Sequence, residues 1–108
     1  MSARLPTGLL VGALLRRVND AGGFAAVLAK GDVQGGSVLF LLADRDGRER
    51  LVERGIGPQG KDALIDSTPA QDVAGYCRRR RERDPDLWVI ELNSPDAERF
   101  AAETMLVD

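Results

Sequence analysis

The chain has no histidine and a single cysteine, Cys77. Histidine is the commonest general base near neutral pH and the commonest metal ligand, so its absence removes both roles. One thiol excludes an internal disulfide and any Cys-x-x-Cys motif for metal or redox chemistry, and it fits a reducing compartment. No nucleophile has an evident base beside it. We therefore expect no metal, no cofactor and no catalytic residues.

The chain also lacks long apolar runs and an excess of charge of either sign. The run from Leu9 to Leu15 is too short to cross a bilayer and closes at Arg16, and Met1–Pro6 shows no signal-peptide pattern. The formal net charge is -2 over 108 residues, so no global field attracts nucleic acid or an anionic membrane. We expect a cytoplasmic protein without a membrane partner, folded as a single domain over residues 1–108.

The most apolar segment of the chain is Leu87–Leu92, which contains the only tryptophan, Trp88. A short run of this kind, rich in β-branched and aromatic residues, is typical of a strand buried on both faces. Alternation along the strand places Trp88, Ile90 and Leu92 on one face. Leu87, Val89 and Glu91 then lie on the other. We predict that Trp88 is buried and that Glu91 meets solvent or a cationic partner.

Periodicity and turn residues predict an α+β domain in the order α-β-β-β-(β)-α-β-α. The predicted elements are a helix from Thr7 to about Ala21, strands at Phe24–Lys30, Ser37–Ala43, Arg48–Arg54 and Lys61–Asp66, a helix from Thr68 to about Glu82, the Leu87 strand and a helix after Ser94-Pro95-Asp96. Asp46-Gly47 predicts a hairpin. We expect a mainly antiparallel four- to five-stranded sheet, covered on one face by two or three helices. The Leu87 strand should lie inside it, beside Phe24–Lys30 or Ser37–Ala43.

Threonines are predicted to cap the first two helices. Thr7 is predicted to cap the first helix. Thr68 is predicted to cap the second, with Pro69 at the first helical position and Gln71 completing a capping box. In the Phe24 strand, alternation puts small residues on one face, which suits a closely packed helix. That face would hold Ala25, Val27 and Ala29.

Arginines gather at the end of the second predicted helix. They are Arg78, Arg79, Arg80, Arg81 and Arg83, followed by Asp84 and Asp86. Successive helical residues point about 100° apart, so the arginines cannot share one face. Some are expected to pack along their stems or to pair with Glu82, Asp84 or Asp86. The alternative is a phosphate or nucleic-acid patch, but Tyr76 is the only nearby aromatic residue for base stacking. These five arginines and two aspartates form the candidate binding surface.

The segment Gly55–Gly60 matches the pattern G-x-G-x-x-G of dinucleotide sites. In those sites the glycines let the backbone approach a pyrophosphate at a helix N-terminus. Here Pro58 removes an amide donor inside the loop, and no β-α-β unit surrounds it. We predict a plain loop.

Three segments together resemble a known family. They are Ala13-Leu14-Leu15-Arg16-Arg17-Val18, Gly22-Gly23-Phe24-Ala25-Ala26-Val27 with Lys30-Gly31, and Asp84 to Leu92, whose Asp-Pro-Asp-Leu-Trp start is the most specific part. The chain is similar, from Leu5 to Leu92, to the bacterial domain-of-unknown-function family 1491 of short alphaproteobacterial proteins. Members often carry an aromatic residue before the Asp-Pro-Asp segment, where this chain has Arg83. The resemblance implies no activity, cofactor or catalytic residue.

The sequence leaves three classes of function open. The first is a small non-enzymatic interaction module with an unknown protein partner or a second copy of itself, suggested by the few charges of Ser37–Ala43 and the lack of catalytic groups. The second is a weak anion or nucleic-acid binder that uses Arg78–Arg83. The third is an enzyme that uses Asp84, Asp86 and Glu91. The interaction module is the prediction, and a nucleic-acid partner is not expected.

Overall fold

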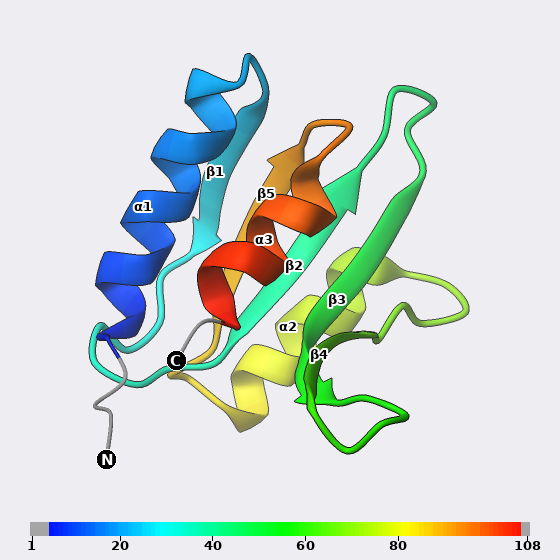
Figure 1. The fold of residues 1–108 in the computed structure, drawn as a ribbon. Coiled ribbons are helices and arrows are strands. Elements are labelled where there is room, and N and C mark those ends of the chain that lie inside the picture. The colour runs from blue at the N-terminus through cyan, green and yellow to red at the C-terminus, as the bar shows by residue number, and fades with distance from the viewer. Residues whose placement is uncertain (1–4, 107–108) are drawn as a thin grey trace.

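A five-stranded sheet in the order β1-β5-β2-β3-β4 forms the middle layer of the protein. The computed structural model describes residues 5–106 (Figure 1). In chain order its elements are α1 (Thr7–Asp20), β1 (Phe24–Ala29), β2 (Val38–Ala43), β3 (Glu49–Ile56), β4 (Asp62–Asp66), α2 (Val73–Arg83), β5 (Trp88–Asn93) and α3 (Ala97–Met105). The predicted α+β class and element order are confirmed.

The strand that follows Leu87 lies inside the sheet. β5 pairs antiparallel with β1 and parallel with β2, and its Ile90 lies opposite Val27 on one side and Phe40 on the other. All other neighbouring strands pair antiparallel. Because β2 and β5 are apolar on both faces apart from Glu91, they occupy interior positions in the sheet. The prediction that the Leu87 strand would neighbour the Phe24 or the Ser37 strand is confirmed on both sides.

The two faces of the sheet carry separate apolar clusters. On one face Trp88, Ile90 and Leu92 pack in a cluster that includes residues of α1 and α3. On the other face a smaller cluster of leucines packs against α2; it contains Leu39, Leu41, Leu51 and Leu87. Figure 1 shows α1 and α3 in front of the sheet and α2 behind it. The expectation that helices cover one face only is therefore wrong, because the leucine cluster on the second face is apolar and α2 packs on it.

The start of α1 differs from the predicted cap. The N-cap residue is Pro6, and no side chain caps the helix. Thr7 is buried, and its hydroxyl donates a hydrogen bond to the carbonyl oxygen of Gly36 at 2.9 Å. The backbone amide of Thr7 donates to Gln34. The loop that follows β1 therefore satisfies the first turn, and the hydroxyl serves a tertiary contact instead of a cap.

Helix α2 starts later than predicted. Its N-cap is Asp72, which has a positive φ of 57° and accepts a hydrogen bond from the amide of Gly75 at 3.0 Å. Thr68 accepts a hydrogen bond from the amide of Leu51 at 2.9 Å, which joins the end of β4 to β3. The predicted capping box at Thr68 is wrong, because a backbone group of a neighbouring strand takes the threonine hydroxyl.

The turns and the last helix follow the predictions. Gly47 has a φ of 79° in the β2–β3 hairpin, as Asp46-Gly47 predicts. Gly55 and Ile56 are the last residues of β3 and pair with β4, and the rest of the Gly55–Gly60 segment is in the hairpin loop between these strands. The segment does not lead from a strand into a helix. In α3 the apolar stripe of Ala97, Phe100, Ala101 and Met105 is buried.

Within residues 5–106 no helix combines the length and apolar character that crossing a bilayer requires.

Candidate functional site

Helix α2 covers only part of its face of the sheet. Its residues Val73, Tyr76 and Cys77 pack on the leucine cluster of β2, β3 and the start of β5. The half of this face formed by β1 and β5 has no helix over it in the described part of the chain, and Figure 1 shows α2 behind the other half. Phe24 and Leu28 of β1 are accordingly 54% and 51% exposed. We call this area the uncovered half-face.

A β-bulge turns two residues of β1 toward the uncovered half-face. The register with β5 shifts between Val27, which pairs with Ile90, and Ala29, which pairs with Val89. The extra residue is Leu28, and both Leu28 and Ala29 line the groove described below. The prediction that Ala29 shares a face with Ala25 is therefore wrong, because alternation breaks at a bulge. Ala25 does pack against the cluster that contains α1.

A groove of about 550 Å³ runs between α2 and the uncovered half-face. Its floor and wall are mostly apolar: Leu28, Ala29, Leu41, Val73, Ala74, Cys77 and Val89. Its rim carries charges of both signs: Glu49, Arg78, Arg81 and Glu82. An apolar hollow with a few charged groups at its margin is the usual character of a binding site.

Glu91 is the one carboxylate in the middle of this apolar surface. It lies between Ala26 of β1 and Leu41 of β2 in the register of the sheet, on the same face as Val89. Its side chain is half-buried, and within residues 5–106 it makes no ion pair and no side-chain hydrogen bond. A carboxylate in this position favours a cation on whatever covers the half-face.

Cys77 forms part of the groove wall and is the only thiol. Burial raises the pKa of the Cys77 thiol; the Arg80 charge opposes this shift, and the Glu49 carboxylate adds to it. The thiol is therefore protonated near neutral pH, and the thiolate is the reactive form. Cys77 contributes apolar surface to the groove and is a poor nucleophile.

Arg80, in the middle of the arginine run, is part of the fold. Its two terminal nitrogens donate to the two carboxylate oxygens of Glu53 on β3 at 2.8 and 2.7 Å, and one of them also donates to the Tyr76 hydroxyl at 3.0 Å. The Ser67 hydroxyl donates to the same carboxylate. The Arg80 hydrogen bonds lower the pKa of Glu53, partial burial opposes them, and Ser67 lowers it further. This network ties α2 to β3 and to the end of β4.

Arg81 is also committed to the fold, through backbone carbonyls. Its Nε donates to the Leu87 carbonyl at 3.0 Å, and one terminal nitrogen donates to those of Lys30 and Pro85, each at 3.1 Å. These bonds hold the end of β1 against the turn that leads into β5. The guanidinium charge stays without a carboxylate partner in the described part of the chain, at the rim of the groove.

The other arginines of the run are on the surface. Arg79 lies 4.0 Å from an oxygen of Asp72, and Arg78 and Arg83 are exposed and take part in none of the ion pairs found within residues 5–106. No ion pair in that range joins the run to Glu82, Asp84 or Asp86. Of the two expected arrangements, pairing with these carboxylates is therefore not the one found there, because Arg80 and Arg81 find better-placed partners on β3 and on backbone carbonyls.

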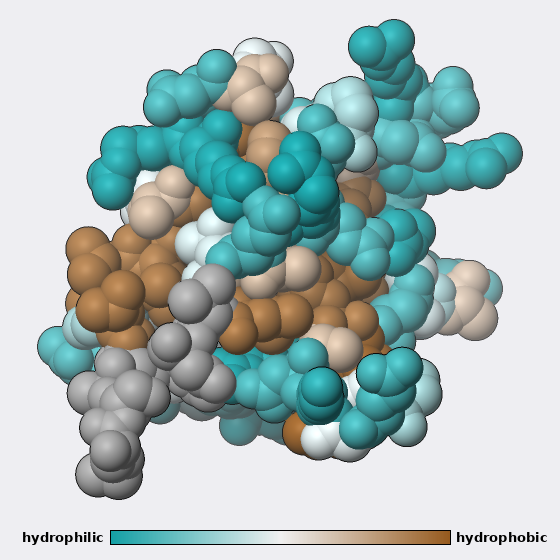
Figure 2. Space-filling model, viewed as in Figure 1, coloured by the Kyte–Doolittle hydropathy of each residue, from teal (hydrophilic) through white to brown (hydrophobic). Residues whose placement is uncertain are grey.

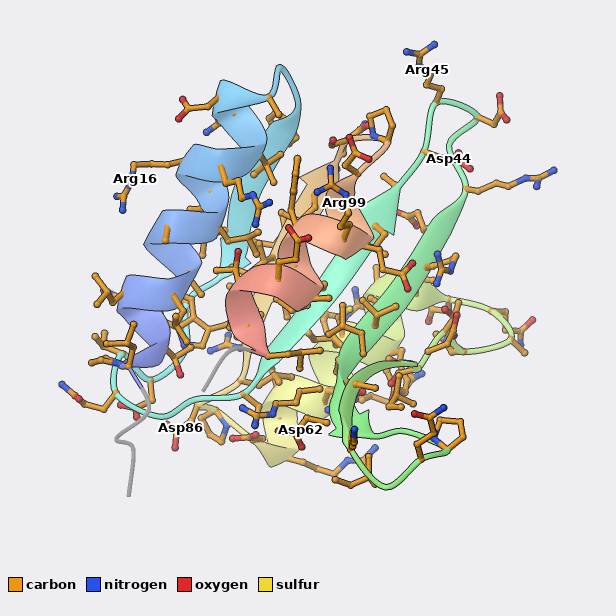
Figure 3. All side chains as sticks on the ribbon, in the orientation of Figure 1. Arg16, Asp44, Arg45, Asp62, Asp86 and Arg99 are labelled. Atoms are coloured by element: carbon orange, nitrogen blue, oxygen red, sulfur yellow. The ribbon has the colours of Figure 1, made fainter. Side chains whose placement is uncertain are left out.

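Asp84 and Asp86 form the turn between α2 and β5. The Asp84 side chain accepts from the Asp86 amide at 3.2 Å, and the Asp86 carbonyl accepts from the Asp32 amide at 3.0 Å. Figure 3 shows Asp86 at the lower end of the sheet, opposite the hairpin tip that carries Arg45. Glu91 lies about 16 Å further along the extended chain. The three carboxylates of the enzyme hypothesis are therefore too far apart to act on one bond.

The acidic residues do not gather into a metal-binding cluster. Across residues 5–106, no group of three or more His, Cys, Asp or Glu side chains is arranged to hold a metal ion. Charged side chains such as Arg16, Asp44 and Asp62 lie at separate margins of the molecule (Figure 3).

Sequence reasoning placed the candidate surface at the end of α2 but missed the groove beside it. The groove depends on where α2 sits over the sheet, which no local pattern encodes. Two signals pointed toward it. Alternation leaves Phe24, Ala26 and Leu28 on the strand face opposite the small residues, and Glu91 is a polar residue in an apolar run. Joining them requires the β1–β5 pairing.

Comparisons with known proteins place the chain in a family. A family model described as a protein of unknown function (DUF1491) matches residues 5–102. A crystal structure of a DUF1491 family protein from Caulobacter crescentus CB15 is 34% identical, with a TM-score of 0.78 over 90% of this chain and 94% of that one. An NMR structure of a DUF1491 family protein from the same organism is 35% identical, with a TM-score of 0.73 over 92% of this chain and 94% of that one.

A third structure agrees with these two. The solution structure of protein Atu0922 from A. tumefaciens is 31% identical, with a TM-score of 0.72 over 98% of this chain and 97% of that one. No curated protein matches the chain. The family match, over nearly the whole described chain, agrees with the resemblance seen in the Ala13, Gly22 and Asp84 segments. The chain belongs to the DUF1491 family.

Proposed function

We propose that the protein is a non-enzymatic interaction module, and that an amphipathic helix of a partner protein docks on the uncovered half-face beside α2. The observation that carries this proposal is the groove between α2 and β1, with its apolar floor of Leu28, Ala29 and Val89. Helix-in-groove binding is a common mode of peptide recognition.

The dimensions favour a helix over a flat protein surface. Neighbouring strands lie about 4.8 Å apart, so β1 and β5 together are about 10 Å wide, which matches the width of one helix with its side chains. The opposite face of the same sheet is covered by two helices, α1 and α3, whereas this face has one. A partner helix would supply the second and would pack alongside α2.

The chemistry of the surface defines the partner further. The floor calls for an apolar stripe at helical spacing, made of residues of medium size. Glu91 lies at the centre of the surface without an ion pair in the described part of the chain. A lysine or arginine within the apolar stripe would meet it, and a partly desolvated charge pair of this kind contributes more to specificity than to affinity.

The test uses photo-cross-linking followed by a direct binding measurement. A benzophenone amino acid replaces Leu28 in one variant and Ile56 in a control; Ile56 is 68% exposed at the end of β3, away from the groove. We expect position 28, and not position 56, to cross-link a segment with an apolar helical stripe and a basic residue. A synthetic peptide of that segment should gain helicity on binding, which circular dichroism measures.

Substitutions then check the site. Leu28→Asp puts a charge on the groove floor and should weaken binding of that peptide by about tenfold or more, whereas Ile56→Asp should leave it unchanged. Glu91→Gln should weaken a peptide with the basic residue and spare one in which that residue is glutamine. Equal cross-linking at positions 28 and 56, or a captured segment without helical periodicity, would argue against helix docking at this surface.

A second candidate is weak anion binding by the arginine run, and the exposure of Arg78, Arg79 and Arg83 favours it. Each phosphate neutralised steepens the salt dependence of binding by roughly 0.7 to 0.9 log units, and three exposed arginines allow few such contacts. With a net charge of -2 the chain adds no long-range attraction. We expect only salt-sensitive binding to nucleic acid in the non-specific range of about 10⁻⁴ to 10⁻⁶ M.

Fluorescence anisotropy near physiological salt measures this affinity. The matched variant is Arg78→Glu/Arg79→Glu, which leaves the Arg80–Glu53 pair intact. Submicromolar affinity that disappears in this variant, with the fold preserved by circular dichroism, would overturn the ranking and promote nucleic-acid binding over helix docking.

A further inference from the structure

The two edges of the sheet have opposite character. The β4 edge is short and carries Asp62 and Asp66 at its two ends; these pair with Arg54 and Arg50 of β3. The β1 edge, Phe24–Ala29, contains no charged residue and no proline. Charges on an edge strand discourage pairing with another chain, and an apolar edge without them invites it. β4 is a protected edge, and β1 is protected only by its bulge.

Exposed apolar side chains gather on the same margin of the molecule. Apart from Ile56, every exposed large apolar residue in the described part of the chain lies on β1, on or just before α1, or in the loop after β1. They are Leu5, Leu9, Phe24, Val27, Leu28 and Val33. Figure 2 shows apolar surface over the N-terminal part of α1, at the left of the view. An accumulation of this kind on one margin is a mark of an association surface.

We propose that a second copy of the chain pairs antiparallel with β1, so that one sheet continues through both copies. A two-fold axis perpendicular to the sheet keeps α1 of both copies on the same face. In an antiparallel pair, directly opposite residues point to the same face of the sheet. For two identical strands related by this axis, that is possible only if one residue lies opposite its own copy. Centring the pair on Ala26 satisfies this and keeps the bulge at Leu28 away from the axis.

This register makes the strand complementary to itself. With Ala26 opposite its own copy, Val27 meets Ala25 of the second copy on the α1 face, and Phe24 meets the bulged Leu28 on the uncovered half-face. Aromatic–aliphatic and aliphatic pairs across neighbouring strands stabilise a sheet. Because the strand has no charges, it offers no electrostatic complementarity that would favour a different protein as partner. In the two-fold pair, each exposed apolar residue of β1 lies against an apolar residue of the second copy.

The size of the surface sets the expected strength. A stable interface buries about 800 Å² per partner, and a six-residue strand with three exposed apolar side chains offers less. The dimer is therefore weak, forming in the micromolar range or above. The dimer forms through the backbone edge of β1, whereas helix docking uses the face of β1 and β5; the two surfaces share Leu28.

Sedimentation analysis over a concentration series, continued into the high-micromolar range, is the first test. The average mass of the wild type should rise toward twice the monomer mass. Val27→Lys puts a cation on the edge and should weaken association on the order of tenfold or more, because two like charges then lie close across the axis. Ile56→Lys is the matched control and should associate like the wild type. A monomer at every concentration would overturn the proposal.

Disulfide trapping tests the register and does not depend on Val27→Lys folding. In the Cys77→Ser background, Ala26→Cys places two thiols across the axis within the Cα separation of a disulfide, about 4.4–6.8 Å. Mild oxidation should convert this variant to a covalent dimer with a rate that grows with concentration. Ile56→Cys in the same background is the control and should cross-link at least tenfold more slowly. Equal rates for the two variants, or a dimer insensitive to Val27→Lys, would place the contact elsewhere and refute pairing through β1.

Discussion

Replacing Trp88 by alanine is expected to lower the free energy of unfolding by about 3–5 kcal/mol. Trp88 is 5% exposed and belongs to the cluster between the sheet and helices α1 and α3. Its indole nitrogen donates a hydrogen bond to the Asp32 carbonyl at 2.8 Å, across the loop that follows β1. Alanine removes the largest side chain of β5, leaves a cavity and loses that hydrogen bond.

Denaturant titration followed by circular dichroism measures the loss, and two variants calibrate it. Trp88→Phe keeps an aromatic ring but loses the hydrogen bond, so a smaller loss of about 1–3 kcal/mol is expected. Ile56→Ala removes an exposed side chain and should stay within about 0.5 kcal/mol of the wild type. The native protein should show blue-shifted tryptophan emission that resists quenching. Red-shifted, quenchable emission would instead make Trp88 a surface residue.

The burial of Trp88 was predictable from the sequence because alternation along Leu87–Leu92 is a local signal. The same holds for the Asp46-Gly47 hairpin and for the stripe of Phe100 and Met105 in α3. In each case residues within one element determine the outcome. The apolar character of Leu87–Leu92 also predicted the interior position of β5 in the sheet.

The cap predictions were wrong where a group distant in the sequence takes the hydrogen bond of a side chain that could have capped a helix. Thr7 and Thr68 both lie in sequence contexts that favour a helix cap. The Thr7 hydroxyl instead donates to the Gly36 carbonyl, and the Thr68 hydroxyl accepts from the Leu51 amide. Local preference for a cap contributes about 1 kcal/mol, which a single tertiary hydrogen bond matches. The bulge at Leu28 likewise belongs to the pairing of β1 with β5 and leaves no mark in the strand itself.

The sequence predicted that the arginines lie at the end of a helix, but not which of them hold the fold together. Four consecutive helical arginines point in different directions and so have different neighbours. The sequence does not say which of them bonds to Glu53, 27 residues away, or which donates to three backbone carbonyls. The structure separates Arg80 and Arg81, which hold α2 against the sheet, from Arg78, Arg79 and Arg83, which remain on the surface. A variant that charge-reverses the whole run would therefore damage the fold and the surface together.

Gly31→Ala is expected to be the second strongly destabilising substitution, with a loss of about 3 kcal/mol. A Cβ at Gly31 would overlap the Asp86 carbonyl oxygen and lie 2.6 Å from Cδ1 of Trp88. The obstacle is backbone on one side and a packed indole on the other, so neither can move without a wider rearrangement. Overpacking of this kind typically costs about 1–3 kcal/mol by itself.

The further loss comes from hydrogen bonds that converge on the same point. The Asp32 amide donates to the Asp86 carbonyl at 3.0 Å, and the Asp32 carbonyl accepts from Trp88. Arg81 bonds to Lys30 and Pro85 on the two sides of the contact. A loop pushed away by one methyl group weakens these bonds together, and each contributes about 0.5–1.5 kcal/mol.

Gly35→Ala is the matched control, because it lies in the same loop but its Cβ would meet no atom closer than 4.0 Å, and its φ is not positive. Its stability should stay within about 0.5 kcal/mol of the wild type, or rise slightly as the unfolded chain loses freedom. Thermal and denaturant unfolding of the two variants, measured side by side, give the difference. If both alanines cost the same, the loop does not rest on the Asp86 carbonyl, and it is held by the hydrogen bonds of Arg81 and Trp88 instead.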